Sequence, residues 1–242
     1  MKIIKVDAID STNSFLKKAV QNGTVKDTTC VVAKMQTKGR GQMGAVWQVE
    51  PGENLTFSVF FKPNFNFQEN LFALSLVTTI SIYQVLKSLP ITKLHIKWPN
   101  DILSDGKKIG GVLIENSFKN NQLEGVIVGI GLNVNQLSFD DLPKASSLKK
   151  LTGIHYSLDE LLNALLISLE EKYLRYTKND FTQLKNNFES YLFRNKKPST
   201  FKAEGQYFTG IIQGVSNSGK LLVLQEDEKL FEYDLKQIEL MY

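Results

Sequence analysis

Apolar residues recur in the first part of the chain at spacings that change between strand-like and helix-like. Lys2 to Val6 predicts a short strand, and Val31 to Met35 and Leu55 to Phe61 predict two further strands. Ahead of the second strand, Asp10-Ser11-Thr12-Asn13 offers several helix N-cap residues, and Asn22-Gly23 supplies a helix end. We therefore expect a helix between the first two strands.

The middle of the chain predicts one buried helix followed by two pairs of strands. Residues 70–87 are apolar nearly all round, as in a helix that is covered on most sides. Strands are expected at Leu94 to Trp98, Ile102-Leu103, Lys108 to Glu115 and Leu123 to Ile130. A bend at Pro99-Asn100-Asp101 separates the first pair, and a polar turn at Lys119-Asn120-Asn121 separates the second.

The last third of the chain predicts two helices and then a series of short strands. Ser157-Leu158-Asp159-Glu160 is a capping box for a helix that reaches about Tyr176, and a second amphipathic helix runs from Asp180 to Leu192. After Lys196-Lys197-Pro198, which we interpret as a linker, strands are expected at Thr200–Ala203, Phe208–Val215, Leu221–Gln225 and Leu230–Tyr233.

The predicted elements and the composition together indicate an ordinary globular protein. The fold class is α+β, with a mixed-sheet domain over residues 1–195 and a small β-barrel of SH3 type over residues 196–242. Hydrophobic residues make up 42% of the 242 positions and charged residues 22%. The net charge of +4 comes from 29 basic residues scattered among 25 acidic ones, which favours a solvated surface over a nucleic-acid-binding face.

Individual residues argue against several other classes. Cys30 is the single cysteine, so no internal disulfide can form, and its apolar surroundings predict a buried thiol. His95 and His155 are far apart and lack ligand-spaced partners, which argues against a zinc site. The longest uncharged stretch, Asn70 to Leu86, carries repeated Ser and Thr and predicts a buried helix, not a membrane span. The first residues lack the apolar core of a signal peptide, so we expect a cytoplasmic protein.

The least ordinary segment is the glycine-rich run from Gln36 to Trp47, which we call the clamp. Three glycines within residues 39–44 allow backbone N–H groups to turn inward and approach an anion closely. Arg40 adds a permanent positive charge, and Trp47 adds a flat face on which a base can stack. A plain turn between strands explains the run equally well, and its spacing fits neither a P-loop nor a Rossmann fingerprint.

Two further segments are polar at places where a core strand would be apolar. Ser11-Thr12-Asn13 presents neutral donors and acceptors, although N-capping alone explains one of the three residues. Lys97-Trp98-Pro99-Asn100-Asp101 combines a cation, an aromatic ring, an amide and a carboxylate, although Pro-Asn-Asp is also a common turn. Asp101 is a candidate Mg²⁺ ligand, because Mg²⁺ takes one or two carboxylates plus substrate phosphates.

Two glycine-containing strands complete the set of unusual segments. Gly110-Gly111, within Lys107 to Glu115, indicates that another group presses against the backbone, whereas Lys107 itself fits a solvated hairpin tip. Gly129 to Asn135 ends an apolar strand with glycines and two amides, a pattern that a bulge and a turn also explain.

The chain resembles the biotin protein ligases, because five motifs of that family occur in order. They are Ser11-Thr12-Asn13, the clamp, Lys97 to Asp101, Lys108 to Glu115 and Gly129 to Val134. Each motif alone is weak, whereas the ordered set is specific, and the resemblance extends over the whole chain, including the C-terminal barrel. It implies an enzyme that activates biotin with MgATP to biotinyl-5′-AMP, releases pyrophosphate, and transfers biotin to one lysine of a biotin carboxyl carrier protein or domain.

The resemblance also implies roles for individual residues. Four match positions that line the biotin pocket: Ser11, Thr12, Asn13 and Gln36. The positions that cover or bind biotin and the adenylate are Gly39, Arg40, Gly41, Gln42, Lys108 and Gly111. Within that group, Lys108 and Arg40 are the residues expected to act in catalysis. The nucleotide is expected at Trp47, Lys97, Asn100 and Asn133, and Mg²⁺ at Asp101.

The chain departs from the family pattern in two places. Well-known members carry several arginines after Gly-Arg-Gly, where this chain has Gln42, Met43 and Ala45. The hypothesis is that Arg40, Lys108 and backbone N–H groups hold the adenylate without them. The second departure concerns the N-terminus. Because the catalytic pattern begins by residue 3, we expect a short form without the DNA-binding domain of some members, and no specific DNA binding.

Three alternatives remain at this point. A lipoate or octanoate ligase shares the fold, although the neutral polar set favours a ureido ring over a plain acyl chain. A non-enzymatic biotin sensor would not need Lys108 or Asp101, and a nucleic-acid binder would need a clustered basic patch. No membrane partner is expected, and the sequence leaves a homodimer open.

Overall fold

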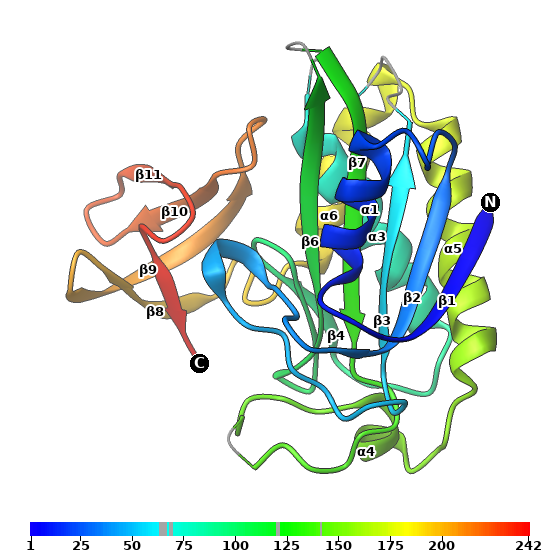
Figure 1. The fold of residues 1–242 in the computed structure, drawn as a ribbon. Coiled ribbons are helices and arrows are strands. Elements are labelled where there is room, and N and C mark those ends of the chain that lie inside the picture. Colours follow the sequence, from blue (N-terminus) through cyan, green and yellow to red (C-terminus); the bar gives the residue numbers. More distant parts are fainter. Residues whose placement is uncertain (63–66, 68–69, 120–121, 141) are drawn as a thin grey trace.

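A computed structural model describes residues 1–62, 67, 70–119, 122–140 and 142–242 (Figure 1). Two residues of the predicted polar turn, Asn120 and Asn121, lie outside the described residues. Among the helices in the described parts of the chain, none is both long enough and apolar enough to cross a membrane.

The larger part of the protein is built on a seven-stranded mixed sheet with the order β1-β2-β3-β7-β6-β5-β4. Its strands are β1 (Lys2–Ile9), β2 (Thr29–Gln36), β3 (Leu55–Phe61), β4 (Leu94–Lys97), β5 (Asp101–Ser104), β6 (Lys107–Lys119) and β7 (Gln122–Leu132). The β1–β2 pair is parallel, and the other neighbouring pairs are antiparallel. The predicted mixed sheet is therefore confirmed.

Helices cover both faces of this sheet, which explains why β3 is buried along its whole length. Helix α1 (Thr12–Gln21) lies on one face of the sheet (Figure 1). Its Leu16 packs there with Phe60 and Ile127. Three helices pack on the other face: α3 (Phe72–Lys87), α5 (Leu158–Arg175) and α6 (Phe181–Tyr191).

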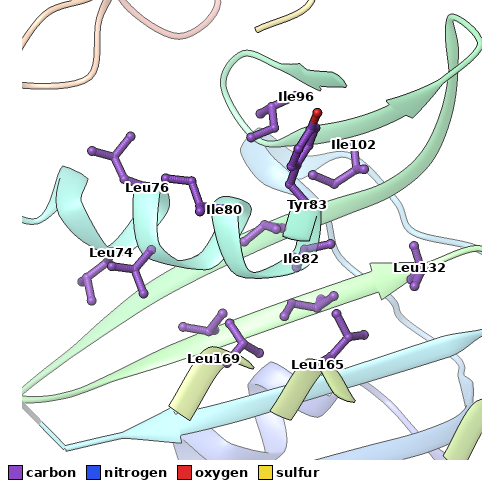
Figure 2. Close-up of a cluster of buried hydrophobic side chains, with 14 of the residues drawn as sticks. Leu74, Leu76, Ile80, Ile82, Tyr83, Ile96, Ile102, Leu132, Leu165 and Leu169 are labelled. Carbon is purple, nitrogen blue, oxygen red and sulfur yellow. The ribbon is translucent and has the colours of Figure 1, made fainter. Parts of the chain in front are cut away.

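The main hydrophobic core lies between the sheet and the helices of the second face. Figure 2 shows Leu74 and Ile82 of α3 on the side of the helix that faces the sheet and Leu165 of α5. Helix α3 is buried nearly all round, as its uniformly apolar sequence predicts. Cys30 joins this core with no exposed surface, so the predicted buried thiol is confirmed.

The C-terminal part forms a second, antiparallel sheet of five strands in the order β11-β10-β9-β8-β12. The strands are β8 (Pro198–Ala203), β9 (Gln206–Val215), β10 (Leu221–Gln225), β11 (Leu230–Tyr233) and β12 (Glu239–Met241). This arrangement is consistent with the expected SH3-like barrel. The structure differs from the prediction at Pro198, which begins β8 instead of ending a linker. The domain division at residues 195 and 196 stays a prediction.

Four short elements of the described chain were not predicted from the sequence. Helix α4 (Leu148–Thr152) spans five residues, and β12 spans three. The 3₁₀ helices η1 (Gln42–Gly44) and η2 (Lys178–Asp180) also span three residues each. Segments of this length contain too few residues to show a period, so the apolar pattern does not reveal them.

Hydrogen bonds attach the second sheet to the first part of the chain. The indole Nε1 of Trp98 donates to the carbonyl oxygen of Gly219 at 2.8 Å, and the amide of Val215 donates to Glu189 Oε1 at 2.9 Å. Gly219 also lies so close to Phe72 that a Cβ atom there would come within 2.5 Å of the Phe72 ring. The orientation of Trp98, which stands inside the predicted Lys97–Asp101 motif, is thus fixed by the second sheet.

Candidate active site

A cavity of about 220 Å³ lies where the start of α1 meets strands β3, β7 and β6. Strand β3 has two different faces here. Phe57 and Val59 belong to the main core, whereas the alternating positions Thr56 and Ser58 lie on the opposite face, since successive strand residues point to opposite sides. The clamp passes over this face and completes the cavity.

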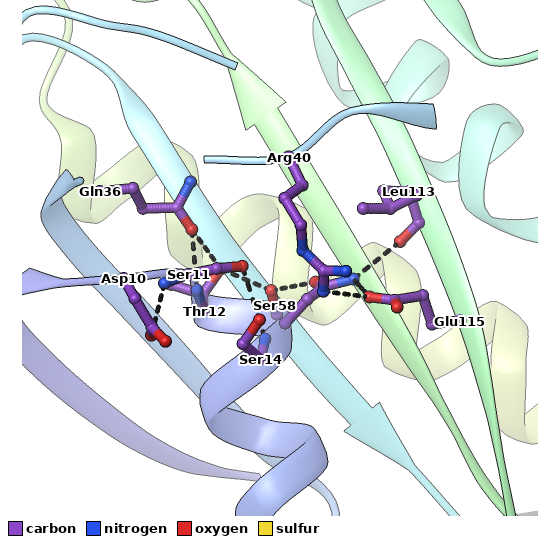
Figure 3. A network of polar contacts seen from close by, with 10 residues as sticks. Asp10, Ser11, Thr12, Ser14, Gln36, Arg40, Ser58, Leu113 and Glu115 are labelled. Atoms are coloured by element: carbon purple, nitrogen blue, oxygen red, sulfur yellow. Dashed lines mark hydrogen bonds and ion pairs between the residues drawn. The ribbon is translucent and has the colours of Figure 1, made fainter. Parts of the chain in front are cut away.

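One end of the cavity is formed by a continuous set of neutral hydrogen-bonding groups (Figure 3). Gln36 Oε1 accepts a hydrogen bond from the backbone N–H of Thr12 at 2.8 Å. The hydroxyl of Thr12 lies 2.6 Å from that of Ser58, and Ser58 donates to Asn13 Oδ1 at 2.5 Å. We call these four side chains the neutral network. Because each member is held by the next, their donors and acceptors have fixed directions before any ligand is bound.

The network ends at a carboxylate. The amide of Asn13 donates to Glu115 Oε2 at 2.7 Å, and Arg40 Nη2 donates to the same oxygen at 2.9 Å. Ser11 has a separate role, because its hydroxyl accepts from the Ser14 N–H and caps α1. N-capping therefore accounts for Ser11, while Thr12 and Asn13 belong to the network.

The floor of the cavity contains two glycines of β7 whose missing side chains make room for their neighbours. A Cβ atom on Gly129 would come within 2.3 Å of Asn13 Oδ1. A Cβ atom on Gly131 would come within 2.3 Å of the Trp47 ring, so the indole lies directly against the Gly131 backbone. Real Cβ atoms do not approach other atoms this closely, and both positions therefore require glycine.

The other end of the cavity is charged. Lys108 Nζ lies 2.6 Å from Asp101 Oδ1, and Lys97 Nζ lies 3.7 Å from Asp101 Oδ2. The Lys108 ammonium is also 5.7 Å from the centroid of the Trp47 ring. The backbone of Lys108 is held on both sides, because its N–H donates to the Lys144 carbonyl at 2.7 Å and its carbonyl accepts from Ser146 at 3.0 Å. Two lysines against one aspartate leave this end with an excess of positive charge.

A tyrosine from the second sheet's side of the molecule reaches the charged end. The Tyr242 ring centroid lies 4.5 Å from Lys144 Nζ and 5.6 Å from Lys97 Nζ, and the ring also contacts Phe193. Burial raises the pKa of Tyr242, and the negative charge of Asp101 raises it further, so its hydroxyl stays protonated at neutral pH.

The clamp itself is a tight, internally bonded loop. The N–H of Gly41 donates to the Ala45 carbonyl at 2.7 Å, and the N–H of Trp47 donates to the Gly39 carbonyl at 3.0 Å. Between them, Met43 adopts a φ of 56°, in the left-handed region that a side chain enters at a cost. Arg40 extends from this loop to Glu115, whereas Lys108 lies at Asp101. The two predicted catalytic cations are thus at different ends of the cavity.

Most of the residues predicted from the sequence come together around this cavity. Those that line it are Ser11, Thr12, Asn13, Gln36, Arg40, Gly41, Gln42, Trp47, Asn100, Asp101, Lys108 and Gly111. Three others do not line it. Gly39 packs against Gln36 and the Trp47 carbonyl, Lys97 lies behind Asp101, and the Asn133 amide donates to the Ser146 carbonyl at 3.0 Å.

The structure also adds residues that had no assigned role. Ser58 completes the neutral network, Glu115 joins it to Arg40, and Thr56 lines the cavity beside Ser58. The sequence does contain a signal for two of them, because Thr56 and Ser58 are the polar positions of an otherwise apolar strand and are two residues apart.

Asp101 fits one kind of metal site only. Within the described parts of the chain, no three His, Cys, Asp or Glu side chains come together in a way that would hold a metal ion. A single carboxylate next to a cavity suits Mg²⁺ when substrate phosphates and water supply the remaining ligands.

Known proteins with similar sequences and structures share this architecture. Residues 6–133 match the model of the biotin/lipoate A/B protein ligase family. The bifunctional ligase/repressor BirA of Bacillus spizizenii is 31% identical over 241 residues, which cover 97% of this chain and 73% of that protein. The biotin–[acetyl-CoA-carboxylase] ligase of Paracoccus denitrificans is 28% identical over 88% of this chain and 90% of its own.

A solved structure is similar over almost the whole chain. The biotin protein ligase from Aquifex aeolicus, in complex with biotin and ATP, superposes with a TM-score of 0.81 at 30% identity. The match covers 99% of this chain and 98% of that one, so it includes the C-terminal sheet as well as the larger sheet.

Proposed function

Since the chain belongs to the biotin/lipoate A/B protein ligase family, we propose that its cavity is the active site of an ATP-dependent biotin protein ligase. In the first step a biotin carboxylate oxygen attacks the α-phosphorus of ATP, and the bond to pyrophosphate breaks, which gives biotinyl-5′-AMP. In the second step the amine of an acceptor lysine attacks the acyl carbon, AMP leaves, and an amide bond forms.

The observation that carries this proposal is the separation of neutral and charged groups within one cavity. Thr12, Asn13 and Gln36 at one end suit the uncharged ureido ring of biotin, because neutral donors and acceptors match it without burying a charge. Lys108 at the other end suits the carboxylate and the phosphate that must meet there. Glycines form the floor between the two ends and leave room for an extended ligand.

Lys108 supports the first step by electrostatics. The reacting carboxylate and phosphate are both anions, and a fixed ammonium between them lowers their repulsion and stabilises the charge that develops on the phosphate. Asp101 holds the ammonium at 2.6 Å, and the Lys144 and Ser146 backbones hold the strand that carries it. Bound Mg²⁺ would neutralise phosphate charge, with Asp101 as its protein ligand.

Arg40 and the clamp support the reaction by enclosing it. A mixed anhydride is hydrolysed by water, so the site must shield it and still open to an acceptor lysine. A glycine-rich loop that orders over the ligand suits both requirements. The guanidinium of Arg40 is the charged donor that the clamp offers to biotin and the adenylate, whereas the N–H of Gly41 is already bonded to the Ala45 carbonyl.

The acceptor that we propose is the biotin carboxyl carrier protein or domain of a biotin-dependent carboxylase. Relatives are named as ligases that act on acetyl-CoA carboxylase, which is such an enzyme. A cytoplasmic location is part of the same proposal.

The test is to mix the protein with biotin, MgATP and a biotin carboxyl carrier domain, and to measure the mass of the carrier. We expect a gain of one biotin on one lysine, and no gain when that lysine is replaced by arginine. ATP–pyrophosphate exchange with lipoate in place of biotin is the parallel measurement. Exchange that responds to lipoate and not to biotin would show that the protein is a lipoate-type ligase.

A further inference from the structure

A threonine hydroxyl in the floor of the cavity has no partner within the described protein. Thr56 is 5% exposed, and its Oγ1 is buried and without a hydrogen-bond partner among the described residues. The hydroxyls of Ser58 and Thr12 nearby are both bonded. Burying an unpaired hydroxyl is unfavourable, so such groups are rare in folded proteins and call for an explanation.

The position of Thr56 suggests that explanation, because the residue lines the cavity and faces away from the main core. It pairs with Gly131 across the β3–β7 ladder. The Trp47 indole lies against Gly131, so a clamp residue covers the immediate neighbour of Thr56. The Trp47 Nε1 atom is also buried and unpartnered in the described structure. Two unsatisfied polar groups therefore border the same glycine on the ligand side of the sheet.

The register of the sheet shows which end of the cavity Thr56 belongs to. A transverse row runs through Thr56, Gly131, Gly111 and Asp101 on strands β3, β7, β6 and β5. Adjacent strands are roughly 4.8 Å apart, so Thr56 and Asp101 are separated by about 14 Å, with two glycines between them. Thr56 is instead two residues from Ser58 on the same face of β3. It thus lies beside the neutral network, two strands away from Gly111, the glycine against which Lys108 Nζ packs.

We propose that the Thr56 hydroxyl is a specificity-determining contact to a polar atom of the uncharged ring head of biotin. This inference rests on the proposed ligase function and extends the neutral network by one residue. A hydroxyl can donate or accept, so it matches either the ureido group or the thioether, and it disfavours a ligand whose head is purely hydrocarbon. The Trp47 ring lies against Gly131 beside this hydroxyl, so a ligand atom reaches Thr56 when the ring is displaced from Gly131.

The test uses Thr56→Val, which removes the hydroxyl and keeps the shape of the side chain. We expect biotin to bind about tenfold more weakly by isothermal titration calorimetry, because a ligand polar atom loses its partner. The melting temperature without biotin should be unchanged or higher, since an unpaired buried hydroxyl has been removed. Thr56→Ser, which keeps the hydroxyl, should restore binding to within about twofold of the wild type.

Thr79→Val is the matched control. Thr79 is also buried, but its hydroxyl donates to the Ser75 carbonyl at 2.6 Å within α3, on the other side of the sheet. This variant should melt at a lower temperature and bind biotin as the wild type does. Thr56→Val is therefore expected to lose biotin affinity without losing stability. Thr79→Val is expected to lose stability without losing biotin affinity.

Biotinamide, in which the carboxylate is replaced by an amide, identifies the end of the ligand that Thr56 contacts. Thr56→Val should weaken the binding of biotinamide by the same factor as it weakens the binding of biotin. A penalty that disappears with biotinamide would place the hydroxyl at the carboxylate and overturn the assignment. Wild-type affinity in Thr56→Val, or a loss of stability like that of Thr79→Val, would overturn it as well. Failure of the wild type to bind biotin would instead refute the ligase function itself.

Discussion

The guanidinium of Arg40 lies 2.9 Å from Glu115 Oε2, the carboxylate oxygen that also accepts a hydrogen bond from Asn13. One atom of β6 thus fastens both the clamp and the start of α1 (Figure 3). Arg40 is 44% exposed, so this ion pair contributes at most about 1 kcal/mol to the free energy of unfolding. Its consequence is the position of the clamp, not the stability of the fold.

Replacing Glu115 by Gln should loosen the clamp while the protein remains folded. The amide oxygen can still accept from Asn13, but Arg40 loses its counter-charge. We expect trypsin to cleave the variant faster after Lys38 or Arg40, with a melting temperature close to that of the wild type. Biotin with ATP should protect these bonds in the wild type, because the loop orders over the adenylate. Equal cleavage of free and biotinyl-AMP-bound protein would contradict the role of the clamp.

Lys108→Ala should lower ATP–pyrophosphate exchange by about 100- to 1,000-fold, the effect of removing one donor that stabilises a developing charge. Lys107→Ala is the matched control, because Lys107 is the adjacent lysine and is exposed. It should leave exchange unchanged.

Gln42→Ala tests the place where the family often has an arginine. Arg40, Lys108 and backbone N–H groups are expected to hold the adenylate without it, so the variant should retain most of its exchange activity. A loss as complete as that of Lys108→Ala would show that Gln42 has taken over an essential role.

Two glycine substitutions should separate the two ligands. An added Cβ at Gly129 would collide with Asn13 Oδ1, and one at Gly131 would collide with the Trp47 ring. Gly129→Ala should therefore weaken biotin binding by about tenfold through the disturbed network. Gly131→Ala should mainly raise the KM for ATP, because Trp47 is displaced. Each variant is the control for the other, and identical effects on both ligands would contradict the division of the cavity.

Tyr242→Ala should raise the KM for ATP and leave biotin binding unchanged. The ring supports the ammonium groups of Lys97 and Lys144 at the charged end, and such contacts contribute about 0.5–1 kcal/mol at exposed sites. The expected change in KM is thus about two- to fivefold. Tyr242→Phe, which keeps the ring, should behave like the wild type. An equal rise of the KM for ATP in Tyr242→Ala and Tyr242→Phe would assign the effect to the hydroxyl instead of the ring.

Burial raises the pKa of the Cys30 thiol from 9.0 to about 12. Because the folded pKa lies above the unfolded one, the stabilising effect of the neutral thiol is complete below about pH 9 and is lost between about pH 9 and 12. In that range the free energy of unfolding of the wild type should fall with pH more steeply than that of Cys30→Ala. The difference between the two slopes should reach up to about 1.4 kcal/mol per pH unit. Native protein at pH 8 should also resist iodoacetamide, and rapid labelling would contradict the burial.

The sequence predicts the elements well where the apolar period is long. Helix α3 and strand β3 follow directly from Leu- and Phe-rich segments, and the cavity lining follows from the ordered motifs. The elements that were missed are too short to show a period, as in α4 and β12.

The remaining site features depend on contacts between residues far apart in the chain. Glu115 is 75 positions from Arg40, and Ser58 is 46 positions from Thr12. No local pattern indicates that these pairs meet, because the register of the sheet brings them together. Tyr242 is a stronger case, since its place beside Lys97 depends on how the second sheet packs against the first.

The hydrogen bond from Trp98 to the Gly219 carbonyl limits how this protein can be recombined with others. Trp98 follows Lys97 directly and precedes Asp101, yet its own partner is in the second sheet. A chimera that carries a foreign C-terminal barrel would have to supply a carbonyl at the place of Gly219 and an aromatic ring at the place of Tyr242. The small barrel is thus a structural component of the charged end of the cavity and is not an exchangeable module.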